Sequence, residues 1–314
     1  MNSPQISVLM PTYNYGRFLP EAIESVLNQT FGDFELLILN DCSNDNSAEV
    51  IAHYAAKDRR IRAHLNSTNL GMVQNCNLGL QLAQGEYLKF LFSDDTLAAR
   101  TTLEKFARML DENPSATLVS CARKVVDQDS KPTTIWAQLG KPGIKKGDDI
   151  ILLCLGEMHN LIGEPSAVMF RKRDAGRGFS SRYRQIMDQE FWMHLLEKGD
   201  LVYTSEPLST FRSHAAQETE MNRSTKLGEK EHLMLLEEYL QKPLLRSAKA
   251  RSAIFNNLYR SRIKRNAPPG LETAMLEALG KQWYPVYWLR HKIIRPFNNL
   301  KQSLQKRSSK RLGS

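Results

Sequence analysis

Short apolar runs and helix-like segments alternate along residues 6–97 of this chain. Apolar runs at 6–10, 34–39 and 87–92 have the length of buried strands, and a further strand is expected at 61–65. Between them, apolar residues such as Leu19, Ile23 and Val26 recur at helical spacing. This alternation predicts an α/β domain, with a mostly parallel central sheet flanked by helices. A chain of 314 residues can bury one such domain and a smaller appendage.

A pair of carboxylates, Asp94 and Asp95, directly follows the last of these apolar runs. Two like charges at the end of a buried strand repel each other, and burial raises their cost. A divalent cation removes both problems, because Mg²⁺ and Mn²⁺ bind carboxylate oxygens together with substrate phosphates. In open α/β sheets, ligands bind at the carboxyl ends of strands. The pair therefore predicts a metal and diphosphate site. The alternative is that Asp94 caps a helix beginning near Thr96.

Other polar residues are expected at the same sheet edge, because they lie in or beside strand-to-helix turns. They are Tyr13, Asn14, Asp41, Asp45, Asn69 and Asn77. A helix from Val73 to Gln84, which contains Asn77, is expected after Gly71 and is ended by Gly85. The sequence contains no glycine-rich phosphate loop. A bound phosphate would therefore depend on a metal and not on a helix N-terminus.

Four motifs in this half stand in the order seen in glycosyltransferase family 2. They are Met-Pro-Thr-Tyr-Asn at 10–14, Leu-Asn-Asp-Cys-Ser-Asn-Asp at 39–45, Asn-Leu-Gly at 69–71 and 77–79, and Gly-Glu-Tyr at 85–87 with Phe-Ser-Asp-Asp at 92–95. The chain resembles that family over residues 1–215. The resemblance implies a Rossmann-like GT-A fold, a nucleotide-sugar donor, a divalent metal and inversion at the sugar carbon.

The resemblance also implies roles for individual residues of this half. Donor binding would fall to Pro11, Thr12, Tyr13, Asn14, Asp41, Asn69, Gly71, Asn77 and Asp94. Thr12 and Tyr13 would hold or stack on the base. Asp41 would accept a hydrogen bond from an imide N–H, which favours a UDP-sugar. Asp95 would bind Mn²⁺ or Mg²⁺. Many members have an acidic residue where this chain has Phe92, which leaves fewer carboxylates for the metal.

A catalytic base is expected in the second half, because an alcohol is a poor nucleophile at neutral pH. Asp188 matches the usual base of the family, and Glu190 is the nearby alternative. From the residues alone, the reading of Asp188 as the N-cap of the helix that carries Trp192 is favoured, and the resemblance turns the preference to the base.

A strand pair is expected at 202–203 and 208–214, ending in an Arg-x-His motif similar to that of the family. His214 would join the metal shell or bind the diphosphate, and a solvated strand-end histidine is the alternative. Arg212 and Glu164, the latter preceding a strand at 167–170, are expected to have acceptor-binding or secondary roles.

The net charge of +9 comes entirely from residues 281–314, which hold nine basic and no acidic residues. Aromatic residues such as Trp283 and Trp288 are interleaved with these charges, which suits an interfacial helix on anionic lipid. Packing on the catalytic domain and nucleic-acid binding are the alternatives, and nucleic acid is the least favoured. We therefore expect a GT-A domain at 1–215, divided into a donor half (1–97) and an acceptor half (98–215). A helical basic extension is expected at 216–314.

Four cysteines without a CxxC pair favour reduced thiols. With a strand at the N-terminus instead of a signal peptide, this favours a cytoplasmic protein at the inner face of the membrane. The expected function is metal-dependent, inverting transfer of a sugar to a hydroxyl of a glycan or lipid-linked acceptor, in cell-envelope polysaccharide synthesis. The alternatives are a nucleotidyltransferase and a non-catalytic nucleotide-sugar-binding protein.

Overall fold

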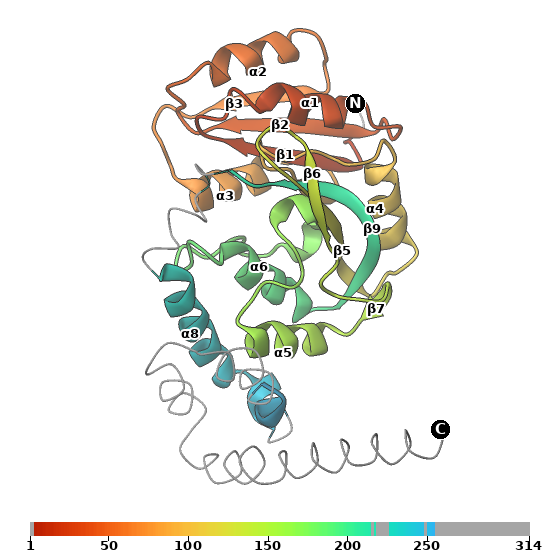
Figure 1. Ribbon diagram of the computed structural model, residues 1–314, viewed down its shortest axis with the longest axis vertical. Coiled ribbons are helices and arrows are strands. Elements are labelled where there is room, and N and C mark those ends of the chain that lie inside the picture. The colour runs from red at the N-terminus through yellow and green to blue at the C-terminus, as the bar shows by residue number, and fades with distance from the viewer. Residues whose placement is uncertain (1–2, 215–216, 218–225, 248–249, 255–314) are drawn as a thin grey trace, which may run out of the picture. The chain divides into compact units, whose positions relative to one another are not determined.

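The computed structural model describes residues 3–214, 217, 226–247 and 250–254 (Figure 1). These described residues divide into two compact units, one made of those at 3–154 and 158–232, and the other of those at 155–157 and 233–254. The predicted boundary after residue 215 stays a prediction. No helix in the described ranges is long and apolar enough to cross a membrane. The basic tail at 281–314, and the expectations attached to it, lie outside the described residues.

The elements follow the alternation expected from the sequence. Their bounds are β1 Ile6–Thr12, α1 Leu19–Leu27, β2 Phe34–Asn40, α2 Ser47–Ala55, β3 Ile61–Leu65, α3 Met72–Leu82, β4 Tyr87–Phe90, α4 Thr102–Asp111, β5 Ala116–Val126, β6 Pro132–Trp136, β7 Gly143–Lys145, α5 Gly147–Glu157, β8 Val168–Arg171, α6 Met187–Leu196, β9 Asp200–Arg212 and α8 Leu227–Leu240, with 3-10 helices at Pro165–Ala167, Lys172–Asp174 and Pro243–Leu245.

One sheet contains all nine strands of the described ranges, in the order β3-β2-β1-β4-β8-β5-β9-β7, with β6 beside β5. Strands β3, β2, β1 and β4 are parallel, and β5 is parallel to β9. β8, β6 and β7 pair antiparallel with their neighbours. The predicted α/β fold with a mostly parallel core is confirmed, with antiparallel strands added. Because the first four strands run the same way, their carboxyl ends share one edge.

Helices lie on both faces of the sheet at its central strands β1, β2 and β4, which explains why these strands are buried along their whole length. Ile6, Val8 and Met10 of β1 belong to one core cluster with residues of α1, α2 and α4. On the opposite face, Gly79 of α3 packs directly against β1 and β2, where an added Cβ would lie 3.1 Å from Leu39 Cδ1. The position therefore requires a small residue for close helix–sheet packing.

The helix α3 ends at Leu82, two residues before the predicted end at Gln84. Glycine was predicted at position 85 as the residue that ends this helix, but the structure gives another cause for it. A Cβ there would lie 2.4 Å from the backbone nitrogen of Ser7. Glycine is needed because the chain passes this close to β1, and not because a helix ends there.

The predicted strand pair at 202–203 and 208–214 is one continuous strand, β9, which curves across the sheet in Figure 1. Its parallel pairing with β5 shifts register near Cys121 and Ala122, and such irregularities bend a strand. The bend lets residues 204–206 reach the surface without ending the strand. β9 then runs on to Arg212, beside the carboxylate pair.

Candidate active site

Four strand-end loops meet at the carboxyl edge of the parallel strands, as expected. The backbone N–H of Asp41 donates to the carbonyl of Thr12 (2.9 Å). The hydroxyl of Ser93 donates to the carbonyl of Pro11 (2.7 Å). These two hydrogen bonds hold together the end of β1, the loop after β2 and the loop after β4.

The loop after β1 is hydrogen-bonded to the loop after β2. Asn14, which has a left-handed φ of 59°, donates its N–H to Ser43 Oγ (2.9 Å) and accepts from the N–H of Asn44 (2.8 Å). Tyr13 stays 42% exposed, and the buried hydroxyl of Thr12 has no hydrogen-bond partner among the described residues. An exposed ring next to an unsatisfied hydroxyl fits a ligand that brings a flat ring and a polar group.

Asp41 is buried and holds the loop after β3. Its Oδ1 accepts from Asn66 Nδ2 (2.7 Å) and from the N–H of Leu70 (2.8 Å), and its Oδ2 accepts from the N–H of Gly71 (2.9 Å). Asn69 Nδ2 donates to the Asp41 carbonyl (3.2 Å). A carboxylate has about four acceptor positions, so Oδ2 keeps room for one more donor. The predicted contact of Asp41 with a base stays a prediction.

Asn77 was expected in or beside a strand-to-helix turn, within the helix predicted at 73–84. It lies inside α3, and its side chain makes both hydrogen bonds with the backbone of Phe179, from Nδ2 to the carbonyl (2.9 Å) and from the N–H to Oδ1 (2.8 Å). It fastens α3 to the segment that precedes α6. Its predicted role in donor binding stays a prediction.

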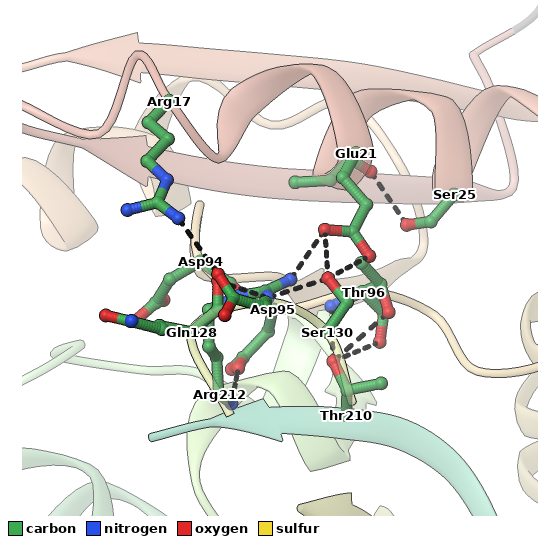
Figure 2. Close-up of polar contacts among 12 residues, drawn as sticks. Arg17, Glu21, Ser25, Asp94, Asp95, Thr96, Gln128, Ser130, Thr210 and Arg212 are labelled. Atoms are coloured by element: carbon green, nitrogen blue, oxygen red, sulfur yellow. Dashed lines mark hydrogen bonds and ion pairs between the residues drawn. The ribbon is translucent and has the colours of Figure 1, made fainter. Parts of the chain in front are cut away.

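Asp94 and Asp95 lie at the sheet edge between α1 and the end of β9 (Figure 2). The next helix, α4, begins only at Thr102 with Thr101 as its N-cap, so Asp94 does not cap a helix near Thr96. Asp95 is 3% exposed, and its Oδ1 accepts the N–H of Arg212 (2.8 Å). Burial raises the pKa of Asp95, and the charge of Asp94 adds to the rise.

Arg212 braces the turn that carries this pair. Its side chain is buried, and Nε donates to the carbonyl of Asp94 (2.6 Å). The guanidinium also reaches Ser130 Oγ (2.8 Å) and Glu21 Oε2 of α1 (2.7 Å), as Figure 2 shows. Its predicted part in acceptor binding stays a prediction, whereas its contacts here fix the carboxylate pair.

His214 is not the solvated strand-end histidine that was the alternative. Its side chain is 6% exposed, packs against the rings of Tyr15 and Phe18, and places Nε2 3.1 Å from Asp94 Oδ2.

In the described part of the chain, no three His, Cys, Asp or Glu side chains form a group that could hold a metal ion by themselves. Two carboxylates with an imidazole nearby nevertheless fit Mg²⁺ or Mn²⁺, because such ions take much of their shell from water and substrate phosphates.

Asp188 lies in the first turn of α6, whose N-cap is Ile186, so Asp188 is not the N-cap itself. Its Oδ2 accepts from Asn160 Nδ2 (2.9 Å) and its Oδ1 from the N–H of Gln189 (2.8 Å). Burial raises the pKa of Asp188 to about 7, and the charge of Glu164 contributes. A carboxylate with a pKa near neutrality suits a general base.

Glu190, the alternative base, is engaged elsewhere. Its buried carboxylate forms an ion pair with Arg177. Glu164 pairs with the buried guanidinium of Arg123, through Nε to Oε2 (2.7 Å) and NH2 to Oε1 (3.1 Å). The charge of Glu164 raises the pKa values of both Asp95 and Asp188. Glu164 therefore links the carboxylate pair and the candidate base electrostatically.

Several residues of the site were not predicted from the sequence. Lys89 of β4 is fully buried, donates to the carbonyls of Phe90 (2.6 Å) and Ser166, and has its pKa lowered to about 7 by burial. Ser166 Oγ accepts the N–H of Phe92 (3.0 Å). A lone lysine within an apolar run is the one signal that could have drawn attention to Lys89. Nothing in the sequence around Asn160 marks it as a partner of Asp188.

Comparisons with known proteins agree with this geometry. A family model for glycosyl transferase family 2 matches residues 7–174. The uncharacterized protein MT1568 of Mycobacterium tuberculosis is 32% identical over 230 residues, which cover 69% of each protein. TuaG of Bacillus subtilis, named for teichuronic acid biosynthesis, is 29% identical over 210 residues, covering 67% of this chain and 79% of TuaG.

Among solved structures, residues 1–349 of S. aureus TarS superpose with a TM-score of 0.67 at 18% identity, covering 96% of this chain and 91% of that one. At this identity the likeness shows the fold, which is the GT-A fold. The matching family model, the relatives and the four converging loops lead to one conclusion. The chain belongs to glycosyltransferase family 2 and is a glycosyltransferase.

Proposed function

We propose that this enzyme is a metal-dependent, inverting glycosyltransferase that moves a sugar from a nucleotide-diphosphate donor to a hydroxyl of a glycan or lipid-linked acceptor. The observation that carries the proposal is that one compact unit holds both the buried Asp94–Asp95 turn at the sheet edge and Asp188, a carboxylate held by Asn160 and the N–H of Gln189 whose pKa is raised to about 7 by burial. The name of TuaG supports a place in cell-envelope polysaccharide synthesis.

In the proposed reaction, the carboxylate of Asp188 takes the proton of the acceptor hydroxyl. The acceptor oxygen forms a bond to the anomeric carbon as the bond from that carbon to the diphosphate oxygen breaks. The nucleotide diphosphate leaves with the electron pair. Attack from the face opposite the leaving group inverts the sugar carbon. Asn160 and the N–H of Gln189 each hold one oxygen of Asp188 and so orient it for this step.

The loops after β1 and β2 would bind the nucleotide. Tyr13 offers an exposed ring for stacking, and Thr12 offers a hydroxyl that has no partner among the described residues. The free acceptor position on Asp41 suits an imide N–H, which favours uracil. TarS has been solved in complex with UDP-GlcNAc, and a related mannosyltransferase from Pyrobaculum calidifontis with GDP-Man and Mn²⁺. We therefore favour a UDP-sugar donor.

Mn²⁺ or Mg²⁺ would be held by Asp95, with Asp94 and His214 beside it. A bound ion would neutralise the negative charge that develops on the departing diphosphate. The buried Arg212 keeps the two carboxylates in place by holding the Asp94 carbonyl and donating its own N–H to Asp95.

The proposal is tested by incubating the protein with a panel of nucleotide-sugars and Mn²⁺ or Mg²⁺, and following release of the nucleotide diphosphate. Release from one donor, stimulated by metal and by an acceptor, is expected. Release of pyrophosphate from a nucleoside triphosphate would instead favour a nucleotidyltransferase. Residues 11–17 lack the basic, glycine-rich loop expected of that class. Binding of a nucleotide-sugar without any turnover would favour the non-catalytic alternative.

The pH dependence of turnover should report on Asp188. Its raised pKa of about 7 means that the carboxylate needed as a base is present above this pH and is lost below it. At saturating donor, kcat should fall about tenfold for each pH unit below 7. The measurement is a pH–rate profile from pH 5 to 9, with donor binding checked at each end. A kcat that stays constant down to pH 5 would argue against Asp188 as the base.

Residues 281–314 are proposed to hold the enzyme at the inner face of the membrane, near a lipid-linked acceptor. Each basic residue near an anionic surface contributes about 1 kcal/mol, and salt screens this attraction. The full chain should therefore float with acidic liposomes at low salt, and a chain truncated after Gly280 should not. Neutral liposomes are the control. Equal flotation of both proteins, or loss of solubility on truncation, would favour a packing role for Trp283 and Trp288.

A further inference from the structure

Glu231, near the start of α8, has a buried carboxylate that lies within the same compact unit as the sheet. The residue is 3% exposed. Its Oε1 accepts the N–H of Arg184 (2.9 Å), and its Oε2 accepts those of Gln185 (2.8 Å) and Ile186 (3.0 Å). Burying a carboxylate is costly unless hydrogen bonds compensate it, and bonds to an ionised acceptor are among the strongest.

The three amides belong to the residues immediately before α6, and Ile186 is the N-cap of that helix. An isoleucine has no side-chain oxygen with which to satisfy the free N–H groups at a helix start. The carboxylate of Glu231, 45 residues further along the chain, instead accepts the N–H of Ile186 itself and those of the two residues before it, and so fixes the chain where it enters α6. A negative charge at this end also interacts favourably with the helix dipole.

The next residue of α8 contacts the other side of the same turn. His232 Nε2 lies 2.9 Å from Oε1 of Gln189, which is fully buried. Asp188 thus lies between Ile186 and Gln189, both of which are held by consecutive residues of α8. These contacts come from beyond residue 215 and beyond the region matched by the family model.

We propose that Glu231 is a positioning residue for the catalytic base. It fixes the backbone before α6 and thereby the place of Asp188 relative to Asn160 and the sugar-transfer site. This rests on the proposed function, in which Asp188 is the base. The segment after residue 215 then has a part in catalysis that is separate from any membrane attachment by 281–314.

The test compares Glu231→Gln and Glu231→Asp with Glu237→Gln, a control that removes the same charge from an exposed position of the same helix. In Glu231→Gln one of the two acceptor oxygens is replaced by an NH₂ group, which is itself a donor and cannot accept from the backbone N–H groups of residues 184–186. We expect its kcat to fall about tenfold or more while the donor KM changes less than about twofold, because small displacements of a base are costly. Glu231→Asp keeps the charge and should recover part of kcat. The control should match the wild type.

Amide hydrogen exchange provides a readout that needs no turnover. In Glu231→Gln, exchange should accelerate at residues 184–190 and stay unchanged in the central strands. If the wild type turns over no nucleotide-sugar, the proposed function fails, whereas exchange still decides whether Glu231 fixes the turn around Asp188. Unchanged exchange at 184–190, a raised donor KM with unchanged kcat, or an Asp variant no better than the Gln variant would overturn the inference.

Discussion

Replacing Asp95 with alanine is expected to abolish sugar transfer and metal-stimulated donor binding. The carboxylate stands at the edge of the sheet where the strand-end loops meet, and burial together with the charge of Asp94 raises its pKa. Such a group is expensive to keep ionised unless a cation lies next to it. Donor affinity should be measured by calorimetry with and without Mn²⁺, alongside nucleotide diphosphate release.

Asp95→Asn keeps the size of the side chain and an oxygen for the N–H of Arg212, so it separates loss of charge from loss of the turn. It should be as inactive as the alanine variant while retaining the wild-type melting temperature. Glu49→Ala, at an exposed position of α2, serves as the control. Donor binding by Asp95→Ala that remains as tight and as metal-sensitive as in the wild type would refute the metal assignment.

Asp188→Asn is expected to bind donor normally and to lose ~10²-fold or more in kcat, as when a general base is removed. The asparagine has nearly the same shape but cannot take the proton of the acceptor hydroxyl. Single-turnover measurements with saturating donor, together with a donor-binding isotherm, would separate chemistry from binding. The variant should also lose the fall in rate below pH 7.

Glu190→Gln is the informative comparison, because Glu190 lies two residues further along α6 and is paired with Arg177. It should retain kcat and lose some thermal stability, since the buried ion pair is broken. An inactive Glu190→Gln together with an active Asp188→Asn would mean that the base had been assigned two residues too early.

Local patterns were sufficient to predict the parallel strands and their loops. β1, β2 and β4 are buried along their whole length, so they appear in the sequence as mainly apolar runs, and polar residues mark their ends. The placement of Asp94 and Asp95 at that edge followed directly. Their functional roles were inferred from the family resemblance, and the experiments above address them.

What the sequence did not predict depends on contacts between distant segments. Gly85 resembles a helix stop, but its backbone is confined by β1. Asn77 lies within the predicted helix, but its hydrogen-bond partner, Phe179, is 102 residues away. β9 resembles two strands, because the bend leaves a short polar stretch in its middle. Glu231 resembles any acidic residue on a helix, because its three partners precede α6.

The brace between Arg212 and the Asp94–Asp95 turn has a consequence for biosynthesis. Arg212 is 117 residues further along the chain than Asp95, yet it supplies the buried donor to that carboxylate. During translation, β1 to β4 are synthesised long before β9. The Asp94–Asp95 turn therefore gains its hydrogen bonds with Arg212 only after residue 212 has been added. Contacts of such sequence separation form late and slowly. Nucleotide-sugar binding should therefore appear only once the chain extends past residue 212.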